Sequence, residues 1–165
     1  PIRAKRKRHP PTVLTENEVE RVLTQMKGTH LLMAKLIYGS GIRLMECIRL
    51  RIQDIDFGQR QLFVRSGKGG KDRTTFLPRL VHDELHQHIE RVKELHRKDL
   101  EQGFGEVYLP NALAKKYRKA AWETSWQYAF PGKTRSIDPR SRKERRHHVL
   151  ESGDPCPNSV KIQCY

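Results

Sequence analysis

Residues 38–57, YGSGIRLMECIRLRIQDIDF, decide the fold because helical and strand periodicity meet within them. In the first part, Leu44, Cys47 and Ile48 share one side of a short helix that is expected to begin just after the glycines. In the second part, the residues around 55–57 favour a short strand. A change from helical to strand periodicity within one such stretch is typical of a domain that combines helices with a separate small sheet.

Two helices are expected before this stretch. Thr15 can cap the first helix, Glu18 completes a capping box, and Gly28 is expected to end it. The second helix runs through LLMAKLIY, residues 31–38, and is expected to end at Gly39. Its apolar residues face nearly all round the helix, which predicts a position at the centre of the core.

Two more strands are expected in QLFVRSGKGGKDRTTFLP, residues 61–78, where a glycine-rich turn separates two runs of alternating polarity. With the strand near residues 55–57, they form a small three-stranded antiparallel sheet. A long helix follows and ends near Gly103. The apolar stripe of this helix consists of Val81, Leu85, Ile89, Val92 and Leu95. We therefore predict an α+β fold that is mainly helical.

Periodicity weakens beyond the long helix. Residues 111–126 have helical composition, and residues 127–132, QYAFPG, indicate a short strand closed by a turn. The basic stretch at residues 133–148 has no usable period, so we expect it to form a loop. Residues 153–165, GDPCPNSVKIQCY, show no recognisable organisation.

The chain is strongly basic, with 33 Lys and Arg against 19 Asp and Glu among 165 residues and a formal net charge of +14. Such an excess repels itself unless a polyanion neutralises it, so nucleic acid is the expected partner. No apolar run is long enough to span a membrane, and the basic N-terminus lacks the apolar stretch of a signal peptide. Because three cysteines cannot all pair with one another, we expect a reduced, cytoplasmic protein.

The sequence GIRLME at residues 41–46 resembles the first conserved box of tyrosine recombinases, the phage integrase family. In that family the arginine of a Gly-Leu/Ile-Arg-x-x-Glu sequence binds the scissile phosphate. The resemblance therefore implies that Arg43 is a catalytic residue and that Glu46 positions it. The chemistry fits, because a planar and permanently charged guanidinium matches the non-bridging oxygens on which negative charge concentrates in the transition state.

The segment SGKGGKDRTTFLP, residues 66–78, is similar to the β-hairpin that carries a catalytic lysine in the same family. The resemblance implies that Lys68 is this lysine, with Lys71 as the near alternative. An ammonium group at a hairpin tip can donate a proton to the leaving 5′-oxygen, and it can also enter a groove of the DNA. Lys71 and Arg73 are accordingly expected to contact DNA.

Residues 106–132 and the loop after them resemble the insertion and following loop of integron integrases, which act on cassette sites folded from one DNA strand. In those enzymes aromatic and histidine side chains hold bases that protrude from the folded hairpin. An aromatic ring offers any exposed base a stacking surface, although packing in the core is an equal alternative for Trp126 and Tyr128. The expected DNA contacts in this part are Trp122, Trp126, Arg145, Arg146, His147 and His148.

The resemblance divides the chain into three parts. Residues 1–13 are expected to be a basic interdomain linker, residues 14–153 the N-terminal part of a tyrosine-recombinase catalytic domain, and residues 154–165 a divergent tail. The family's His/Lys-x-x-Arg box, Gly-His pair and nucleophilic tyrosine have no counterpart after residue 153. We therefore expect a truncated, catalytically incomplete chain in which Tyr165 is not the nucleophile, because a phenol needs neighbours that stabilise its anion.

These features predict an integron-integrase-like protein that takes part in site-specific DNA recombination and the integration of gene cassettes. DNA is the expected partner, in the form of folded single-stranded cassette sites, and family members assemble as tetramers on DNA. The expected location is the bacterial cytoplasm, at the nucleoid when bound to DNA, with no membrane partner. No cofactor is expected, because bond energy is conserved in the family's 3′-phosphotyrosyl link.

The residues leave one alternative function open and suggest one weaker site. In the alternative, the basic surface is the whole function and the chain is a non-catalytic nucleic-acid-binding module. His82 and His86 are spaced as in zinc-protease helices, but packing of Leu85 and Ile89 explains this helix and no third ligand is evident. No metal site is therefore predicted.

Overall fold

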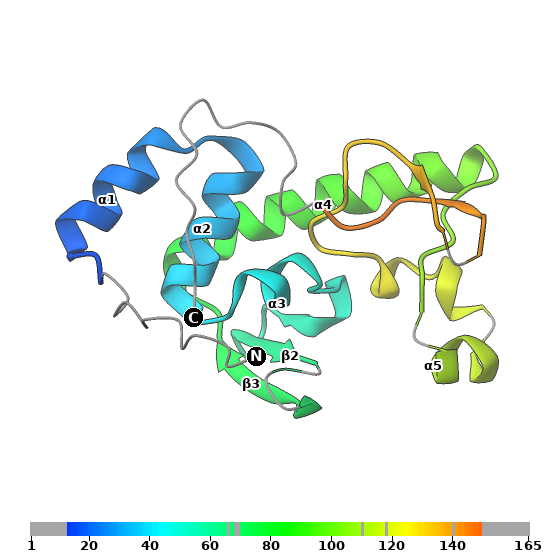
Figure 1. Cartoon of the computed structure of the whole chain (residues 1–165), viewed down its shortest axis with the longest axis horizontal. Helices are drawn as coiled ribbons and strands as arrows, with labels where there is room; N and C mark the ends of the chain where they lie inside the picture. Colours follow the sequence, from blue (N-terminus) through cyan, green and yellow to red (C-terminus); the bar gives the residue numbers. More distant parts are fainter. Residues whose placement is uncertain are drawn as a thin grey trace, which may run out of the picture.

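The computed structural model describes residues 13–65, 67, 70–109, 111–117, 119–139 and 141–149. Helix α4 (Arg79–Glu101) runs along most of the molecule and supports two regions. Helices α2 and α3 and the small sheet lie along its first half, α1 extends beyond its start, and the segment after residue 104 lies along its second half (Figure 1). The predicted tail at residues 154–165 and nearly all of the predicted linker at residues 1–13 lie outside the described residues.

The first two helices begin and end close to the predicted positions. The capping box of α1 (Glu16–Gln25) is confirmed, because the backbone N–H of Thr15 donates to Glu18 over 2.8 Å and the Glu18 N–H donates back to the Thr15 hydroxyl. The predicted role of Gly28 is wrong: α1 ends at Gln25, and Gly28 is the first residue of α2 (Gly28–Ser40). Helix α2 continues past Gly39 and ends at Gly41, whose φ of 67° suits a glycine cap.

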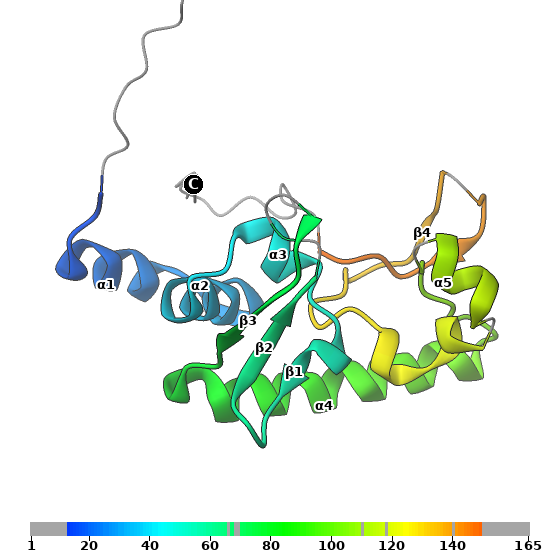
Figure 2. The same ribbon diagram turned by 90° about the horizontal axis from the view of Figure 1, so that it is seen from below.

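The change of periodicity within residues 38–57 is confirmed. A short helix α3 (Leu44–Ile48) and a 3₁₀ turn η1 (Ile52–Asp54) lead into strand β1 (Ile55–Asp56). Strands β2 (Gln61–Val64) and β3 (Arg73–Phe76) complete an antiparallel sheet in the order β1-β2-β3 (Figure 2). The predicted α+β fold with a three-stranded antiparallel sheet is therefore correct.

The main core lies between α2, α3, the inner face of the sheet and α4. Leu62 and Val64 alternate into this core from β2, and the apolar stripe of α4 meets them. The hydroxyl of Thr75 on β3 donates to the carbonyl of Ser40 over 2.8 Å, which satisfies an acceptor at the end of α2. Cys47 is fully buried here, and burial raises the pKa of its thiol to about 12. The core therefore fixes the start of α3 relative to the sheet.

The second region is less regular than predicted. Residues 111–126 form a short helix α5 (Asn111–Lys116) and two 3₁₀ turns, η3 (Ala120–Trp122) and η4 (Thr124–Trp126). The strand expected at residues 127–132 appears only as isolated bridges, one from Arg51 to Tyr128 and one from Pro131 to His148. The stretch expected to be a loop contains a small hairpin of β4 (Ser136–Ile137) and β5 (Glu144–Arg145).

A buried arginine joins the two regions. The side chain of Arg51 donates to the carbonyl of Tyr108 over 2.8 Å and to the carbonyl of Trp126. Its guanidinium carbon lies 4.7 Å from the centre of the Tyr128 ring, within the range of a cation–π contact. Burial lowers the pKa of Arg51 from its ordinary value, although a guanidinium stays charged. Arg51 is thus one of the contacts that hold the second region to the first, together with the backbone hydrogen bonds from Ile52 to Gln127 and from Ala129 to Leu50.

We expect Arg51→Ala to lower the free energy of unfolding by about 2–4 kcal/mol, because two carbonyls lose their donor and a space opens between the regions. Urea denaturation followed by circular dichroism measures this. Arg97→Ala is the control, since Arg97 is exposed and pairs only with Glu94 and Glu101 on the surface of α4. Equal losses for the two variants would contradict the role given to Arg51.

Candidate phosphate-binding site

The carboxylate of Glu46 lies at the centre of a cluster of basic groups. Its side chain is 9% exposed, and it accepts hydrogen bonds from two arginines on different elements. One oxygen accepts from the Arg43 guanidinium over 3.0 Å, and the other accepts from the Arg43 backbone N–H over 2.8 Å. Arg73 on β3 donates to the same two oxygens over 3.2 and 2.9 Å. The structure therefore brings the predicted pair Arg43 and Glu46 together and adds Arg73.

Arg43 is placed to receive an anion. It is the residue that precedes the first turn of α3, and the Glu46 carboxylate fixes its backbone from within that turn. Its side chain is 40% exposed, and only one nitrogen of its guanidinium is engaged by Glu46. An exposed guanidinium of this kind can bind a phosphate through two parallel hydrogen bonds.

The base of the β2–β3 hairpin lies beside this cluster. The Gly67 N–H donates to the Lys71 carbonyl over 3.0 Å, and Lys71 is exposed. A side chain at position 67 would start 3.2 Å from a carboxylate oxygen of Glu46, which shows how closely the hairpin approaches. Lys68 follows Gly67 in the sequence but lies outside the described residues, so its catalytic role stays a prediction.

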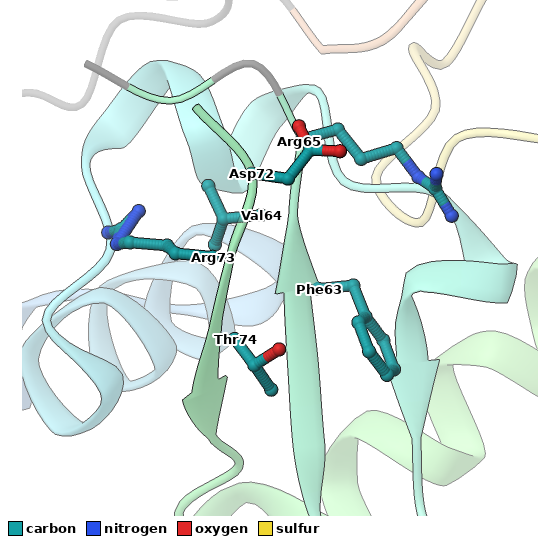
Figure 3. Close-up of a pocket in the computed structure, with 6 residues that line it drawn as sticks. All are labelled: Phe63, Val64, Arg65, Asp72, Arg73 and Thr74. Carbon is teal, nitrogen blue, oxygen red and sulfur yellow. The ribbon is translucent and has the colours of Figure 1, made fainter. Parts of the chain in front are cut away.

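The two faces of the hairpin carry different groups. Figure 3 shows Arg73 directed to the α3 side, whereas Phe63 and Arg65 lie on the opposite side. Arg65 pairs with the buried carboxylate of Asp54 over 2.6 Å. The surface around Phe63 holds a shallow pocket of about 170 Å³. The basic cluster around Glu46 is thus confined to one face of the hairpin.

The aromatic residues expected to contact DNA differ in exposure. Trp122 is 43% exposed, so part of its side chain is accessible to a ligand. Trp126 is half-buried against a second small core formed by Val107, Leu109 and the neighbouring residues. Tyr128 is 7% exposed and belongs to that core. Of the three rings, Trp122 is therefore the one most open to stacking with a base.

The two arginines expected to contact DNA form internal ion pairs. Arg145 is buried and pairs with Asp138 over 2.9 Å and with Glu106. Arg146 makes two hydrogen bonds of 2.6 and 2.8 Å to the carboxylate of Asp99. A phosphate could reach either guanidinium only if these pairs opened. The sequence showed the positive charges but not the acidic partners, which lie between 7 and 47 residues away.

His147 and His148 lie beside the core rather than on an open loop. Both are half-buried, and the ring of His148 packs edge-on against the Tyr128 ring at 5.2 Å. The backbone N–H of Gly132 donates to the His147 carbonyl over 2.7 Å. Contact of these two histidines with DNA stays a prediction.

Four histidines on α4 have packing roles that their positions in the sequence did not indicate. His88 contacts the Ala129 carbonyl over 2.9 Å, and His96 lies 3.1 Å from the Thr124 hydroxyl, so both hold the second region on α4. Burial lowers the pKa of each. The rings of His82 and His86 both pack edge-on against Phe57. Within the described residues, no group of three metal-ligating side chains comes together.

Comparison with known proteins places the chain in a family. The model of the phage integrase family matches residues 12–147, so the chain belongs to the phage integrase family. Two proteins described as integrase/recombinase, from Escherichia coli and Pseudomonas aeruginosa, are each 41% identical over 141 residues. A tyrosine recombinase XerA from Pyrococcus furiosus is 40% identical over 84 residues, which is 49% of this chain and 29% of that protein.

The chain spans less than half the length of the two integrase/recombinase proteins. The alignment to the two integrase/recombinase proteins covers 86% of this chain but 42% of each of theirs. A crystal structure of XerA recombinase matches with a TM-score of 0.45 and 26% identity, over 52% of this chain and 32% of the other. Among the described residues, no helix is both long enough and apolar enough to cross a membrane.

Asp99 gives a test of the internal ion pairs. It accepts from Arg135 over 3.0 Å as well as from Arg146, and it connects the end of α4 to residues 132–148. We expect Asp99→Asn to lower the free energy of unfolding by about 2–3 kcal/mol. Hydrogen exchange should also be faster at the amide groups of Gly132 and Asp138, which donate within this segment. Asp83→Asn is the control, because that side chain on the same helix is 94% exposed.

The difference in stability between wild type and Asp99→Asn should change with pH in a defined direction. Burial alone would raise the pKa of Asp99, but hydrogen bonds and charge from Arg146 and Arg135 outweigh it and hold the pKa below its ordinary 3.8. The carboxylate therefore stabilises the fold above that value, and this contribution is lost as the pH falls below it. The stability difference between wild type and Asp99→Asn should be constant near neutral pH and shrink only below pH 3.8. A difference that already shrinks between pH 7 and 5 would contradict the assignment.

Proposed function

We propose that this chain binds DNA as part of a site-specific tyrosine recombinase and that Arg43 holds the scissile phosphate. Membership of the phage integrase family supports DNA recombination as the process. In the proposed reaction a tyrosine that has lost its phenolic proton to water attacks the phosphorus, the bond to the 5′-oxygen breaks, and Lys68 gives a proton to that leaving oxygen. Arg43 stabilises the charge that develops on the non-bridging oxygens.

The observation that carries this proposal is the arrangement of Arg43 around Glu46. The Arg43 side chain is 40% exposed and donates to Glu46 through one guanidinium nitrogen, and Glu46 lies beside the base of the hairpin at Gly67. Lys68 is the next residue after Gly67 in the sequence, which supports the assignment of this hairpin and Arg43 to one site. By contrast, Arg51 and Arg146 are largely buried, and each donates through two or more guanidinium nitrogens.

We also propose that the substrate is a folded single-stranded site of the kind found in integron cassettes. The exposed ring of Trp122 supports this, because it stands on an irregular segment and offers a surface on which an unpaired base can stack. Assembly as a tetramer on DNA and work at the bacterial nucleoid are part of the same proposal. The alternative, a non-catalytic nucleic-acid-binding module, is favoured only by the net charge of +14.

Native gel shifts with a folded hairpin and a plain duplex test the binding. We expect tighter binding to the hairpin, and a logarithmic affinity that falls with the logarithm of salt concentration by about 0.7–0.9 per neutralised phosphate. Arg43→Ala should weaken binding and reduce the slope by about one phosphate contact, whereas the control Arg97→Ala should change neither. Equal losses for both variants would favour the non-catalytic alternative.

Covalent trapping on a nicked hairpin tests the expectation that this chain does not complete strand transfer by itself. We expect no protein–DNA adduct on a denaturing gel, because the family's second arginine and nucleophilic tyrosine have no counterpart in the sequence. Tyr165 lies outside the described residues, and mass spectrometry would identify it if it were the attacking group. An adduct at any tyrosine would overturn this part of the proposal.

A further inference from the structure

We infer that Arg73 is a positioning residue, which couples the lysine-bearing hairpin to Arg43 through the shared carboxylate of Glu46. The inference rests on the proposed function, because it assigns to Arg73 an effect on the phosphate-binding arginine. It replaces the expectation that Arg73 contacts DNA directly. Arg73 would then act on a phosphate only through Glu46 and Arg43.

The geometry of the guanidinium carries this assignment. Both terminal nitrogens of Arg73 are directed at Glu46, over 3.2 Å to one oxygen and 2.9 Å to the other. This is the two-pronged contact that only an arginine can make with a carboxylate. Arg43 uses one nitrogen on the same carboxylate and keeps the others open. The two arginines are therefore not equivalent. Arg73 binds both oxygens of the carboxylate, whereas Arg43 is oriented by it.

The burial of Glu46 strengthens its ion pair with Arg73. Its side chain is 9% exposed, so its charge is screened less by solvent and salt than that of a surface pair. With two guanidinium groups against one carboxylate, the cluster keeps one net positive charge for an incoming phosphate. Without the hydrogen bonds from Arg73, the Glu46 carboxylate could rotate and accept from the Arg43 guanidinium with both oxygens. Fewer N–H groups of Arg43 would then remain for DNA.

The position of Arg73 in the chain connects this grip to the hairpin. Arg73 is the first residue of β3, and its partner across the ladder is Val64, the last residue of β2. Gly67, inside the intervening turn, leaves little room for a side chain, because a Cβ there would lie 3.2 Å from a Glu46 carboxylate oxygen and 3.1 Å from the Lys71 carbonyl. Arg73 and Gly67 thus both lie against Glu46, and Lys68 directly follows Gly67 in the sequence. A change in the position of the hairpin would therefore alter the position of Arg43 through the Glu46 carboxylate.

A double-mutant cycle on the full chain tests the coupling, with affinity for a folded DNA hairpin as the readout. We expect Arg73→Ala to weaken binding about threefold in the wild-type background and to have almost no effect when Arg43 is already alanine, because contacting groups couple and independent ones add. Arg73→Ala alone should leave the salt slope close to that of the wild type, since it removes no phosphate contact.

Arg65→Ala is the matched control. Arg65 flanks the other side of the same turn, is also partly exposed, and pairs with Asp54 rather than with Glu46. Its effect on affinity should be the same with and without Arg43. An equal dependence of Arg65→Ala on the Arg43 background would mean that the cycle reports general loosening of the hairpin, and the inference would fail.

Arg73→Lys separates positioning from charge and guards against loss of the fold. Lysine keeps the positive charge but cannot bind both oxygens at once. We expect Arg73→Lys to resemble Arg73→Ala in the cycle, and the Gly67 amide, which donates to the Lys71 carbonyl, to exchange its hydrogen about tenfold faster in both variants. Restoration of affinity by lysine would mean that Arg73 is a direct DNA contact, and would overturn the inference.

The outcomes distinguish this inference from the proposed function. If Arg43→Ala leaves affinity and salt slope unchanged, the proposed role of Arg43 fails and the coupling fails with it. If Arg43→Ala weakens binding but Arg73→Ala weakens it by the same factor in both backgrounds, the proposed function stands and only the coupling is wrong.

Discussion

The guanidinium of Arg51 has to find its hydrogen-bond acceptors inside the protein, and this requirement fixes how the second half of the chain lies on the first. A buried cation is tolerated only when its donors are satisfied, and the acceptors here are backbone carbonyls of Tyr108 and Trp126 with the Tyr128 ring beside them. Segments that are far apart in the sequence are thereby brought to one point. The contacts of Arg51 therefore help to position Trp122, His147 and His148, which lie in this second half.

Much of the fold could be predicted because it is encoded locally. The capping box at Thr15, the stripe along α4 and the alternation in β2 each reflect one element against one apolar environment. What could not be predicted depends on distant partners. The β4–β5 hairpin could not be recognised from the sequence because it has no hydrophobic period. An ion pair between Arg145 and Asp138 helps to hold it. His88 and His96 could not be distinguished from surface histidines, since their acceptors lie 41 and 28 residues away.

The candidate site shows the same division. Arg43 and Glu46 are three residues apart in one motif, and the structure places them in contact as the motif implied. Arg73 is 27 residues from Glu46, and nothing in its neighbours along the chain indicates the carboxylate that it grips. Arg145 and Arg146 were assigned to DNA because charge is visible in a sequence and pairing is not. A basic composition therefore overstates how many arginines stand ready for a polyanion.

The burial of these ion pairs has a practical consequence for handling the protein. The carboxylates of Glu46, Asp54, Asp99 and Asp138 are almost wholly shielded from solvent, so dissolved ions reach them poorly. Exposed lysines and arginines have no such protection. Concentrated salt should therefore strip co-purifying nucleic acid from the surface while the internal pairs remain closed. A high-salt wash during purification would clean the protein of its polyanion without opening its fold.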